Sequence, residues 1–280
     1  MRLFVTGGTG FVGSHFLQQA LAAGHEVVAL RRPGSQPRVP LAVQPRWVDG
    51  ALDADWSDAL QGCDVLVHLA SHTPNPPYAP LDECLYWNVF AGMKLAVDAA
   101  AVGISRFLVA GSCFEYGQVP ASAGDLATTQ PLAPTLSYPT SKAAASVAFE
   151  GFAREQGHRV KILRIFQVYG EGEQATRLWP SLRRAAAEGK DFPMSAGEQV
   201  RDFVRVEDVA AQFVRHLDFS LTVPGEPTVH HVGSGQAQTL LEFAQHWWNV
   251  FGATGELQPG RVPYRKNELF RLVPHPSSLN

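Results

Sequence analysis

Cysteine is scarce in this sequence of 280 residues, and the number and spacing of the cysteines argue against both a disulfide-stabilised fold and a zinc-binding fold. Cys63, Cys84 and Cys113 are odd in number and lack the paired spacing of a zinc site. Neither a disulfide framework nor a bound metal is therefore expected. Reduced thiols of this kind are typical of a cytoplasmic protein.

Charge is also sparse, because charged residues make up 18% of the chain and the net charge is -3. This balance provides neither the basic surface that binds nucleic acids nor an acidic tail. No apolar run is long enough to span a bilayer, and no secretory signal is recognisable after Met1. We therefore expect a cytoplasmic protein with small-molecule partners that binds neither nucleic acid nor membrane.

What the sequence does contain is a regular alternation of two patterns. Short apolar runs typical of buried strands are separated by stretches with helical periodicity. This alternation predicts an α/β fold with a doubly wound parallel sheet of the Rossmann type. The expected strands are Arg2–Thr6, Glu26–Leu30, Asp64–Leu69, Phe107–Ala110 and Val160–Ile165, and the clearest helices are Phe11–Ala23 and Leu81–Val102.

The alternation fails between Tyr169 and Val200, and glycine and proline punctuate the end of the chain. We interpret residues 1–168, with about 204–235, as the NAD(P)-binding Rossmann domain. Residues of about 169–203 and 236–280 are expected to form a smaller C-terminal lobe that binds the substrate. The prolines of SHTPNPPYAP, residues 71–80, exclude a helix or a central strand, so this stretch is interpreted as a loop over the site.

The first predicted strand leads directly into TGGTGFVGSH, which has the glycine spacing of a dinucleotide-binding loop. Gly7 allows the tight turn, Gly10 lets the backbone approach a pyrophosphate, and Gly13 lets the following helix pack closely. The amides at the start of that helix would face the phosphates. The position after a strand and before a helix favours cofactor binding over a purely structural turn.

Arg31 and Arg32 directly follow the second predicted strand, about twenty residues beyond the loop, where an acidic residue would hold the ribose of NAD. Adjacent guanidinium groups suit a 2′-phosphate, which an aspartate would repel. We therefore expect NADP(H) to be preferred, with NAD(H) possible. The alternative is that both arginines are merely exposed in a loop.

Tyr138 and Lys142 stand four residues apart in YPTSK, at the start of a predicted helix. At this spacing two side chains share one helix face, and an ammonium beside a phenol lowers the phenol pKa from about 10. Tyr138 is thus a candidate acid or base, although the pair alone also fits a solvated helix start. Ser112 favours catalysis, because it ends an apolar strand and can bind a substrate oxygen at the sheet edge where ligands bind.

Several motifs together resemble those of the extended short-chain dehydrogenase/reductases, in particular the NAD-dependent epimerase/dehydratase group acting on nucleotide sugars. They are VTGGTGFVGSH, LVHLAS, YWNV, GSCFEYG, YPTSK, LRIFQVYGEGE and RDFVRVEDVA, and they cover nearly the whole chain. The resemblance implies a catalytic set of Ser112, Tyr138 and Lys142, in which Tyr138 and Lys142 also contact the cofactor. It implies a homodimer formed through the helices at 81–102 and 137–156. It further implies cofactor contacts from the backbone of Phe11, Val12, Leu69, Ala70 and Ser71.

The resemblance also indicates which residues bind the substrate. Arg201 would contact the substrate diphosphate, and Gln167 stands where an asparagine near the sugar is usual. A salt bridge to Asp202 is the alternative role for Arg201. His72 and Thr73 begin the proline-rich loop and are candidates to line the sugar pocket, although a surface role is equally compatible.

The sequence departs from the family pattern at two places, one that bears on the type of reaction and one that bears on the adenine contact. Sugar-nucleotide 4,6-dehydratases carry an Asp-Glu pair directly after the catalytic Ser or Thr, whereas this chain has Cys113 and Phe114. A 4,6-dehydratase is therefore not expected. The acidic residue that contacts adenine in the family is replaced by Ala51, for which Asp49 or Asp53 is a candidate substitute.

Some conspicuous residues have a simpler interpretation. His230 and His231 lack carboxylate or cysteine partners at metal-ligand spacing, so no metal site is expected there. Trp247 and Trp248 lie in a helical stretch and are expected to pack. Cys113 has no evident activating base and is interpreted as a small filler at a strand end.

These observations favour an NADPH-dependent reductase of a nucleotide-linked 4-keto-deoxysugar. The paired arginines motivate this choice, because a reductase consumes NADPH at every turnover. A nucleotide-sugar 4-epimerase with tightly bound NAD is the alternative that uses the same catalytic residues. A non-catalytic dinucleotide-sensing module is an alternative of another class, and the intact set of Ser112, Tyr138 and Lys142 argues against it.

Overall fold

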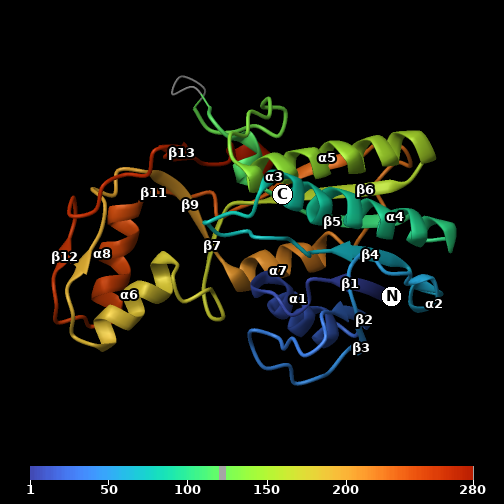
Figure 1. Ribbon diagram of the computed structural model, residues 1–280, viewed down its shortest axis with the longest axis horizontal. Helices are drawn as coiled ribbons and strands as arrows, with labels where there is room; N and C mark the ends of the chain where they lie inside the picture. The colour runs from blue at the N-terminus through green and yellow to red at the C-terminus, as the bar shows by residue number, and fades with distance from the viewer. Residues whose placement is uncertain (120–123, 280) are drawn as a thin grey trace.

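The computed structural model describes residues 1–119 and 124–279, and its core is a parallel sheet of seven strands. The strand order is β10-β6-β5-β4-β1-β2-β3, with the crossovers of a doubly wound sheet (Figure 1). The predicted Rossmann-type fold is thereby confirmed. The strands are β1 (Arg2–Thr6), β2 (Glu26–Arg31), β3 (Arg46–Asp49), β4 (Val65–His68), β5 (Arg106–Ser112), β6 (Arg159–Ile165) and β10 (Thr228–Val232).

Both faces of this sheet carry apolar side chains, and helices cover each face and bury them. On one face, α1 (Phe11–Ala22) packs with α7 (Val206–Arg215). On the other face, α4 (Ala91–Ala101) and α5 (Ser137–Gln156) pack side by side, with the short α2 (Ser57–Leu60) near the edge (Figure 1). Each layer of helices encloses one apolar core, so the sheet separates two cores.

The helix expected at 81–102 is divided into three parts. It begins as α3 (Leu81–Leu85), widens into the π-helix η1 (Tyr86–Phe90), and continues as α4. The π-helical turn carries Asn88, which is 3% exposed and donates a hydrogen bond of 2.9 Å to Ser141 Oγ on α5. Such widened turns are frequent at functional sites.

A smaller lobe lies to the left of the main sheet in Figure 1. Here α6 (Leu178–Ala187) packs against α8 (Leu240–Val250), beside the paired strands β8 (Phe192–Pro193) and β12 (Leu257–Gln258). Trp247 and Trp248 pack within this lobe, as expected. A second sheet consists of β7 (Gln167–Tyr169), β9 (Val200–Arg205), β11 (Ala237–Thr239) and β13 (Arg271–Leu272).

The position of β9 bears on the predicted division into two domains. The predicted boundary between residues 203 and 204 falls inside this strand, which pairs with β7, β11 and β13. A division into a nucleotide-binding part and a substrate-binding lobe is kept as a proposal, with β9 as the shared element.

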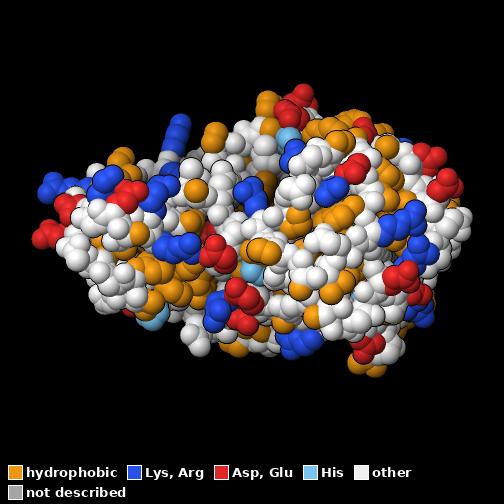
Figure 2. All heavy atoms as spheres, turned by 90° about the horizontal axis from the view of Figure 1, so that it is seen from below, with side chains coloured by type: hydrophobic (Ala, Val, Ile, Leu, Met, Phe, Trp, Pro, Cys, Tyr) orange, Lys and Arg blue, Asp and Glu red, His pale blue; other side chains and the backbone are white. Residues whose placement is uncertain are grey.

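The surface agrees with the modest net charge of the sequence. On the face seen in Figure 2, acidic and basic side chains are interspersed. Within the described ranges, 1–119 and 124–279, no helix is both long and apolar enough to cross a membrane.

Candidate active site

The predicted site residues come from strands that are neighbours in the main sheet. Gly7 follows β1, Leu69 follows β4, and Ser112 ends β5. Because β1, β4 and β5 are adjacent and parallel, their carboxyl ends meet at one edge of the sheet. This is the edge where open α/β sheets bind their ligands.

The glycine loop after β1 has the geometry that a dinucleotide requires. Gly7 has a φ of +73°, and a Cβ atom at Gly13 would lie only 2.0 Å from the Gly7 carbonyl oxygen. Helix α1 therefore packs directly on the turn. Its N-cap, Gly10, makes no side-chain cap, and the first turn of the helix has no acidic residue. The amides at this terminus remain available for phosphate groups, so the loop fits a dinucleotide.

The segment after β4 closes against the same loop. A Cβ atom at Gly7 would lie 2.5 Å from the backbone nitrogen of Ala70, so the two segments touch. The Ala70 N–H donates to Thr6 Oγ1 at 3.3 Å, which fixes the segment that begins at Leu69. This arrangement brings together the predicted cofactor contacts of the two segments: Gly7, Gly10, Phe11, Val12, Gly13, Leu69, Ala70 and Ser71.

Tyr138 lies at the start of α5 with its hydroxyl in hydrogen-bonding contact with the side chains of Ser71 and Ser112. Both Tyr138 and Ser112 are buried. The structure thus places the hydroxyls of Tyr138 and Ser112 together, and their catalytic roles stay predictions. The sequence predicted only a backbone contact from Ser71 to the cofactor, so the contact of its side chain with Tyr138 is an addition.

The expected lowering of the Tyr138 pKa by Lys142 is wrong for this structure. Burial raises the pKa of Tyr138, and the hydrogen bonds from Ser71 and Ser112 only partly oppose this effect. Lys142 Nζ instead donates to the carbonyl oxygen of Ala110 at 2.6 Å. Spacing along a helix correctly placed both side chains on one face, but it could not reveal the carbonyl acceptor on β5. The protonated phenol is the form that a proton donor needs.

The proline-rich loop at 71–80 lies against Tyr138, the candidate proton donor, as expected for a loop over the site. The ring of Tyr78 contacts that of Tyr138 with centroids 5.4 Å apart. Sequence reasoning did not single out Tyr78, although its place in the loop could have indicated it. Arg177 and Arg265 lie close enough to Tyr78 to lower its pKa, against a larger opposite effect of burial.

The two loop residues predicted to line the sugar pocket have partners within the protein. His72 Nε2 lies 2.8 Å from Glu83 Oε1, and the His72 N–H donates to Asn88 Oδ1 at 2.7 Å. The hydroxyl of Thr73 accepts from the N–H of Ala79 at 3.3 Å and thereby closes the loop. Both residues hold the loop in place, and their contact with a sugar stays a prediction.

The paired arginines differ in their surroundings. Arg31 Nε donates to Asp49 Oδ1 at 2.7 Å, and its guanidinium lies 4.8 Å from the centre of the Trp47 ring. Arg32 is exposed, and the loop that follows it reaches the glycine loop through Ser35. Arg32 is therefore the less constrained of the two candidates for a 2′-phosphate.

The candidate substitutes for the missing adenine contact are also engaged. Asp49 accepts from Arg31, and Asp53 accepts a 2.6 Å hydrogen bond from the hydroxyl of Tyr86. The structure thus gives both carboxylates a role within the protein. Their contact with adenine stays a prediction.

Arg201 lies on β9 and is 6% exposed. The suggested salt bridge to Asp202 is wrong, because Arg201 pairs with Glu268 at 3.3 Å and Asp202 accepts from Ser234. Neighbouring residues on a strand point to opposite faces, which separates the two side chains. Gln167 begins β7 and pairs with β9, so it belongs to the same small sheet. Substrate contacts by Arg201 and Gln167 stay predictions.

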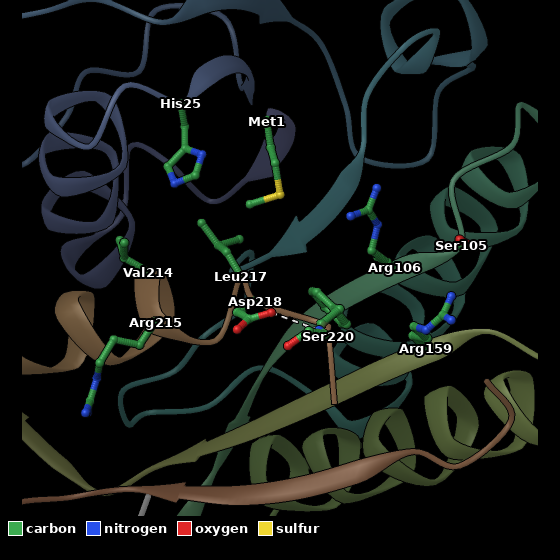
Figure 3. Close-up of a pocket in the computed structure, with 11 residues that line it drawn as sticks. Met1, His25, Ser105, Arg106, Arg159, Val214, Arg215, Leu217, Asp218 and Ser220 are labelled. Atoms are coloured by element: carbon green, nitrogen blue, oxygen red, sulfur yellow. Dashed lines mark hydrogen bonds between the residues drawn. The ribbon is translucent and has the colours of Figure 1, made fainter. Parts of the chain in front are cut away.

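A separate pocket of about 700 Å³ lies at the opposite edge of the main sheet (Figure 3). Its lining includes Met1, Arg106 and Arg159, which stand at the amino ends of their strands. Arg106 pairs with Asp64 and Arg159 donates to the Thr222 carbonyl. This pocket is remote from the candidate catalytic residues, and Arg106 and Arg159 are both engaged within the protein.

A glycine loop, a strand-end serine and a Tyr-Lys pair at one sheet edge define a dinucleotide-dependent enzyme of the extended short-chain dehydrogenase/reductase type. The chain belongs to the NAD dependent epimerase/dehydratase family, whose model matches residues 3–227.

Three similar proteins illustrate the range of this family. The chain is 27% identical to a dTDP-glucose 4,6-dehydratase of Streptomyces niveus, covering 97% of this chain and 83% of that protein. It is 24% identical to a dTDP-6-deoxy-L-talose 4-dehydrogenase (NAD(+)) of Aggregatibacter actinomycetemcomitans, covering 86% and 87%. Among solved structures, TunA, an NAD dependent NDP-hexosamine 5,6-dehydratase of tunicamycin biosynthesis, matches with a TM-score of 0.85 and 27% identity, covering 98% and 89%.

Proposed function

We propose that this protein is an NADPH-dependent reductase of a nucleotide-linked 4-keto-deoxysugar. The observation that carries the proposal is the pairing of Ser112 with Tyr138, without an acid at the two positions that follow Ser112. Cys113 is buried, and burial raises its pKa to about 12, so its thiol is no acid or base near neutral pH. Glu115 is fully buried and bonded within the protein. Reduction needs no water-expelling acid, whereas dehydration does.

In the proposed reaction, Ser112 donates a hydrogen bond to the substrate carbonyl and polarises it. A dinucleotide held through its pyrophosphate at the glycine loop would supply the hydride for the carbonyl carbon. Tyr138 gives its proton to the carbonyl oxygen, which yields an alcohol, and the phenolate is then reprotonated from solvent. Lys142 would contact the nicotinamide ribose while it holds the end of β5 through the Ala110 carbonyl. Arg201 is assigned to the substrate diphosphate, with Gln167, His72 and Thr73 near the sugar.

The similarity to a dTDP-6-deoxy-L-talose 4-dehydrogenase supports this choice of reaction. Oxidation at C4 of a deoxysugar is the reverse of the proposed reduction. That relative is named for NAD(+), whereas the preference for NADPH proposed here rests on Arg31 and Arg32. The epimerases of the family provide the competing function, in which NAD would stay bound and be recycled.

One experiment distinguishes the two functions. Mass spectrometry of the purified protein would identify co-purified cofactor and sugar nucleotide. A panel of keto-sugar nucleotides, including dTDP-4-keto-6-deoxyglucose, is then tested for consumption of NADPH and NADH. A reductase consumes NADPH in proportion to product. An enzyme that purifies with NAD and interconverts sugar nucleotides without added cofactor would instead be the epimerase.

We further propose a homodimer formed through the outer faces of the helical segment 81–102, which includes η1 and α4, and of α5. Phe90 is 58% exposed, Val97 is 47% exposed, and Val147 on α5 is 61% exposed. Large apolar side chains gathered on neighbouring helices are characteristic of an interaction surface. Val147→Glu places a charge in this interface and is expected to yield a monomer in light scattering after gel filtration. Leu221→Glu, at a 95% exposed position in the loop between α7 and β10, is the control and should leave the dimer intact. A wild-type monomer at micromolar concentration contradicts the proposal.

A further inference from the structure

Glu115 lies three residues after Ser112, and its carboxylate is fully buried. Its Oε1 atom accepts the backbone N–H of Ser112 at 2.7 Å. Its Oε2 atom accepts from Ser146 Oγ and from Arg164 Nε, both at 2.8 Å. The three donors belong to the end of β5, to α5 and to β6. One carboxylate therefore ties together the elements that carry the catalytic residues.

The bond to the Ser112 backbone is half of a capping box. The other half is the N–H of Phe114, which donates to Ser112 Oγ at 3.2 Å. This pair of bonds fixes both the main chain and the hydroxyl oxygen of Ser112. The hydroxyl hydrogen is left to donate to Tyr138 or to a substrate oxygen.

The bond to Ser146 sets the position of Ser112 relative to α5. Ser146 lies four residues after Lys142 and eight after Tyr138, so the three residues lie along one face of the helix. Through Glu115, the end of β5 is attached to the same helix face that presents the proton donor.

The residue before Ser112 is Gly111, whose lack of a side chain leaves room for this carboxylate. A Cβ atom at Gly111 would lie 2.9 Å from Glu115 Oε1 and 2.9 Å from Arg164 Cγ. Arg164 is itself held by the hydroxyl of Tyr116 at 2.8 Å. A buried ion pair is often no more stable than apolar packing of the same volume. Its presence beside the site is therefore better explained by positioning than by stability.

We propose that Glu115 is a positioning residue that holds the Ser112 hydroxyl against the substrate carbonyl during reduction. The inference rests on the proposed function, because it requires Ser112 to polarise that carbonyl. A reacting group misplaced by about 1 Å can cost about 10²-fold in rate. Loss of Glu115 should therefore lower kcat, while substrate and cofactor affinity, which depend on other residues, should change little.

Glu115→Gln is the direct test, because the amide keeps the volume but offers one acceptor oxygen where three donors converge. With dTDP-4-keto-6-deoxyglucose and NADPH, or a faster substrate from the panel above, kcat should fall about 10- to 100-fold at nearly constant KM. Ser112→Ala should lower kcat by about 10²–10³-fold, as expected for loss of a polarising donor. In the Ser112→Ala background, Glu115→Gln should cause almost no further loss.

Tyr116→Phe is the matched control, because it removes a partner of Arg164 but leaves all three bonds to Glu115. It should lower the melting temperature and leave kcat near the parent value. Ser146→Ala removes one bond to Glu115 but keeps the ion pair between Glu115 and Arg164. If Glu115→Gln does not fold, Ser146→Ala replaces it in the double-mutant cycle with Ser112→Ala. It should also lower kcat at constant KM.

Three outcomes overturn the inference. If the losses from Glu115→Gln and Ser112→Ala multiply in the double variant, Glu115 does not act through Ser112. If Tyr116→Phe lowers kcat as much as Glu115→Gln, the effect is one of stability alone. If Ser112→Ala leaves kcat unchanged, Ser112 does not polarise the substrate carbonyl, and the proposed function fails together with the inference. The first two outcomes overturn only the role of Glu115.

Discussion

Replacing Tyr138 by phenylalanine is expected to lower kcat for keto-sugar reduction by about 10²–10⁴-fold, the usual contribution of general acid catalysis. The variant keeps the ring that packs against Tyr78 and removes only the hydroxyl beside Ser71 and Ser112. Affinity for NADPH should hardly change. Stopped-flow measurement of hydride transfer at saturating keto-sugar, together with a fluorescence titration of NADPH, measures both quantities.

The companion variant Lys142→Met distinguishes a proton donor from a residue with two roles. Lys142 is assigned to the cofactor ribose and also holds β5 through the Ala110 carbonyl, close to Ser112, so its loss should weaken cofactor binding and slow turnover together. Because burial raises the pKa of Tyr138, the phenol stays protonated and the wild-type rate should be flat across the neutral pH range. Hydride transfer at the original rate in Tyr138→Phe would exclude this tyrosine as the acid.

Changing Arg31 and Arg32 to alanine should weaken NADPH far more than NADH, because the lost contacts concern only the 2′-phosphate. Each charged hydrogen bond contributes about 1.5–3 kcal/mol, so the double change is expected to cost about 100-fold or more in cofactor selectivity. Since Arg31 is already bonded to Asp49, Arg32→Ala alone should account for the larger part. Titration of both cofactors against each variant gives the selectivity directly.

Arg46→Ala is the control for the loss of positive charge. Arg46 begins β3, at the end of the strand away from the glycine loop, so its removal should affect both cofactors equally. If the unmodified protein binds NADPH and NADH with equal affinity, the preference inferred from the two arginines is wrong.

The sequence predicted the fold well because its strongest signals are local. The first strand is found at Arg2–Thr6 as expected, and the helix expected at Phe11–Ala23 ends at Ala22, since a buried strand and an amphipathic helix each leave a periodic pattern. The helix expected at 81–102 was wrong in its geometry, because a single π-helical turn shifts the apolar pattern by only one residue and is easily overlooked. The shared role of β9 depends on pairings across long sequence separations, which no local pattern specifies.

The candidate site shows the same limit. Spacing and motifs brought Ser112, Tyr138 and Lys142 to one sheet edge, because strand ends and helix faces follow from periodicity. They did not predict that Lys142 donates to a backbone carbonyl. Nor did they predict the ring of Tyr78 against Tyr138. Such contacts depend on how loops and burial place a polar group.

The π-helical turn at Tyr86–Phe90 makes this part of the chain sensitive to length rather than to composition. A π-helical turn holds one residue more than an α-helical turn, so deleting one residue here would close it into an α-helical turn and shift the side chains that it presents by roughly the 100° that one helical residue covers. Asn88 would then lose its bonds to His72 and Ser141 without any change in its own identity. A one-residue deletion between 86 and 90 is therefore expected to misplace the proline-rich loop, and conservative substitutions on the outer face of the turn are expected to be tolerated.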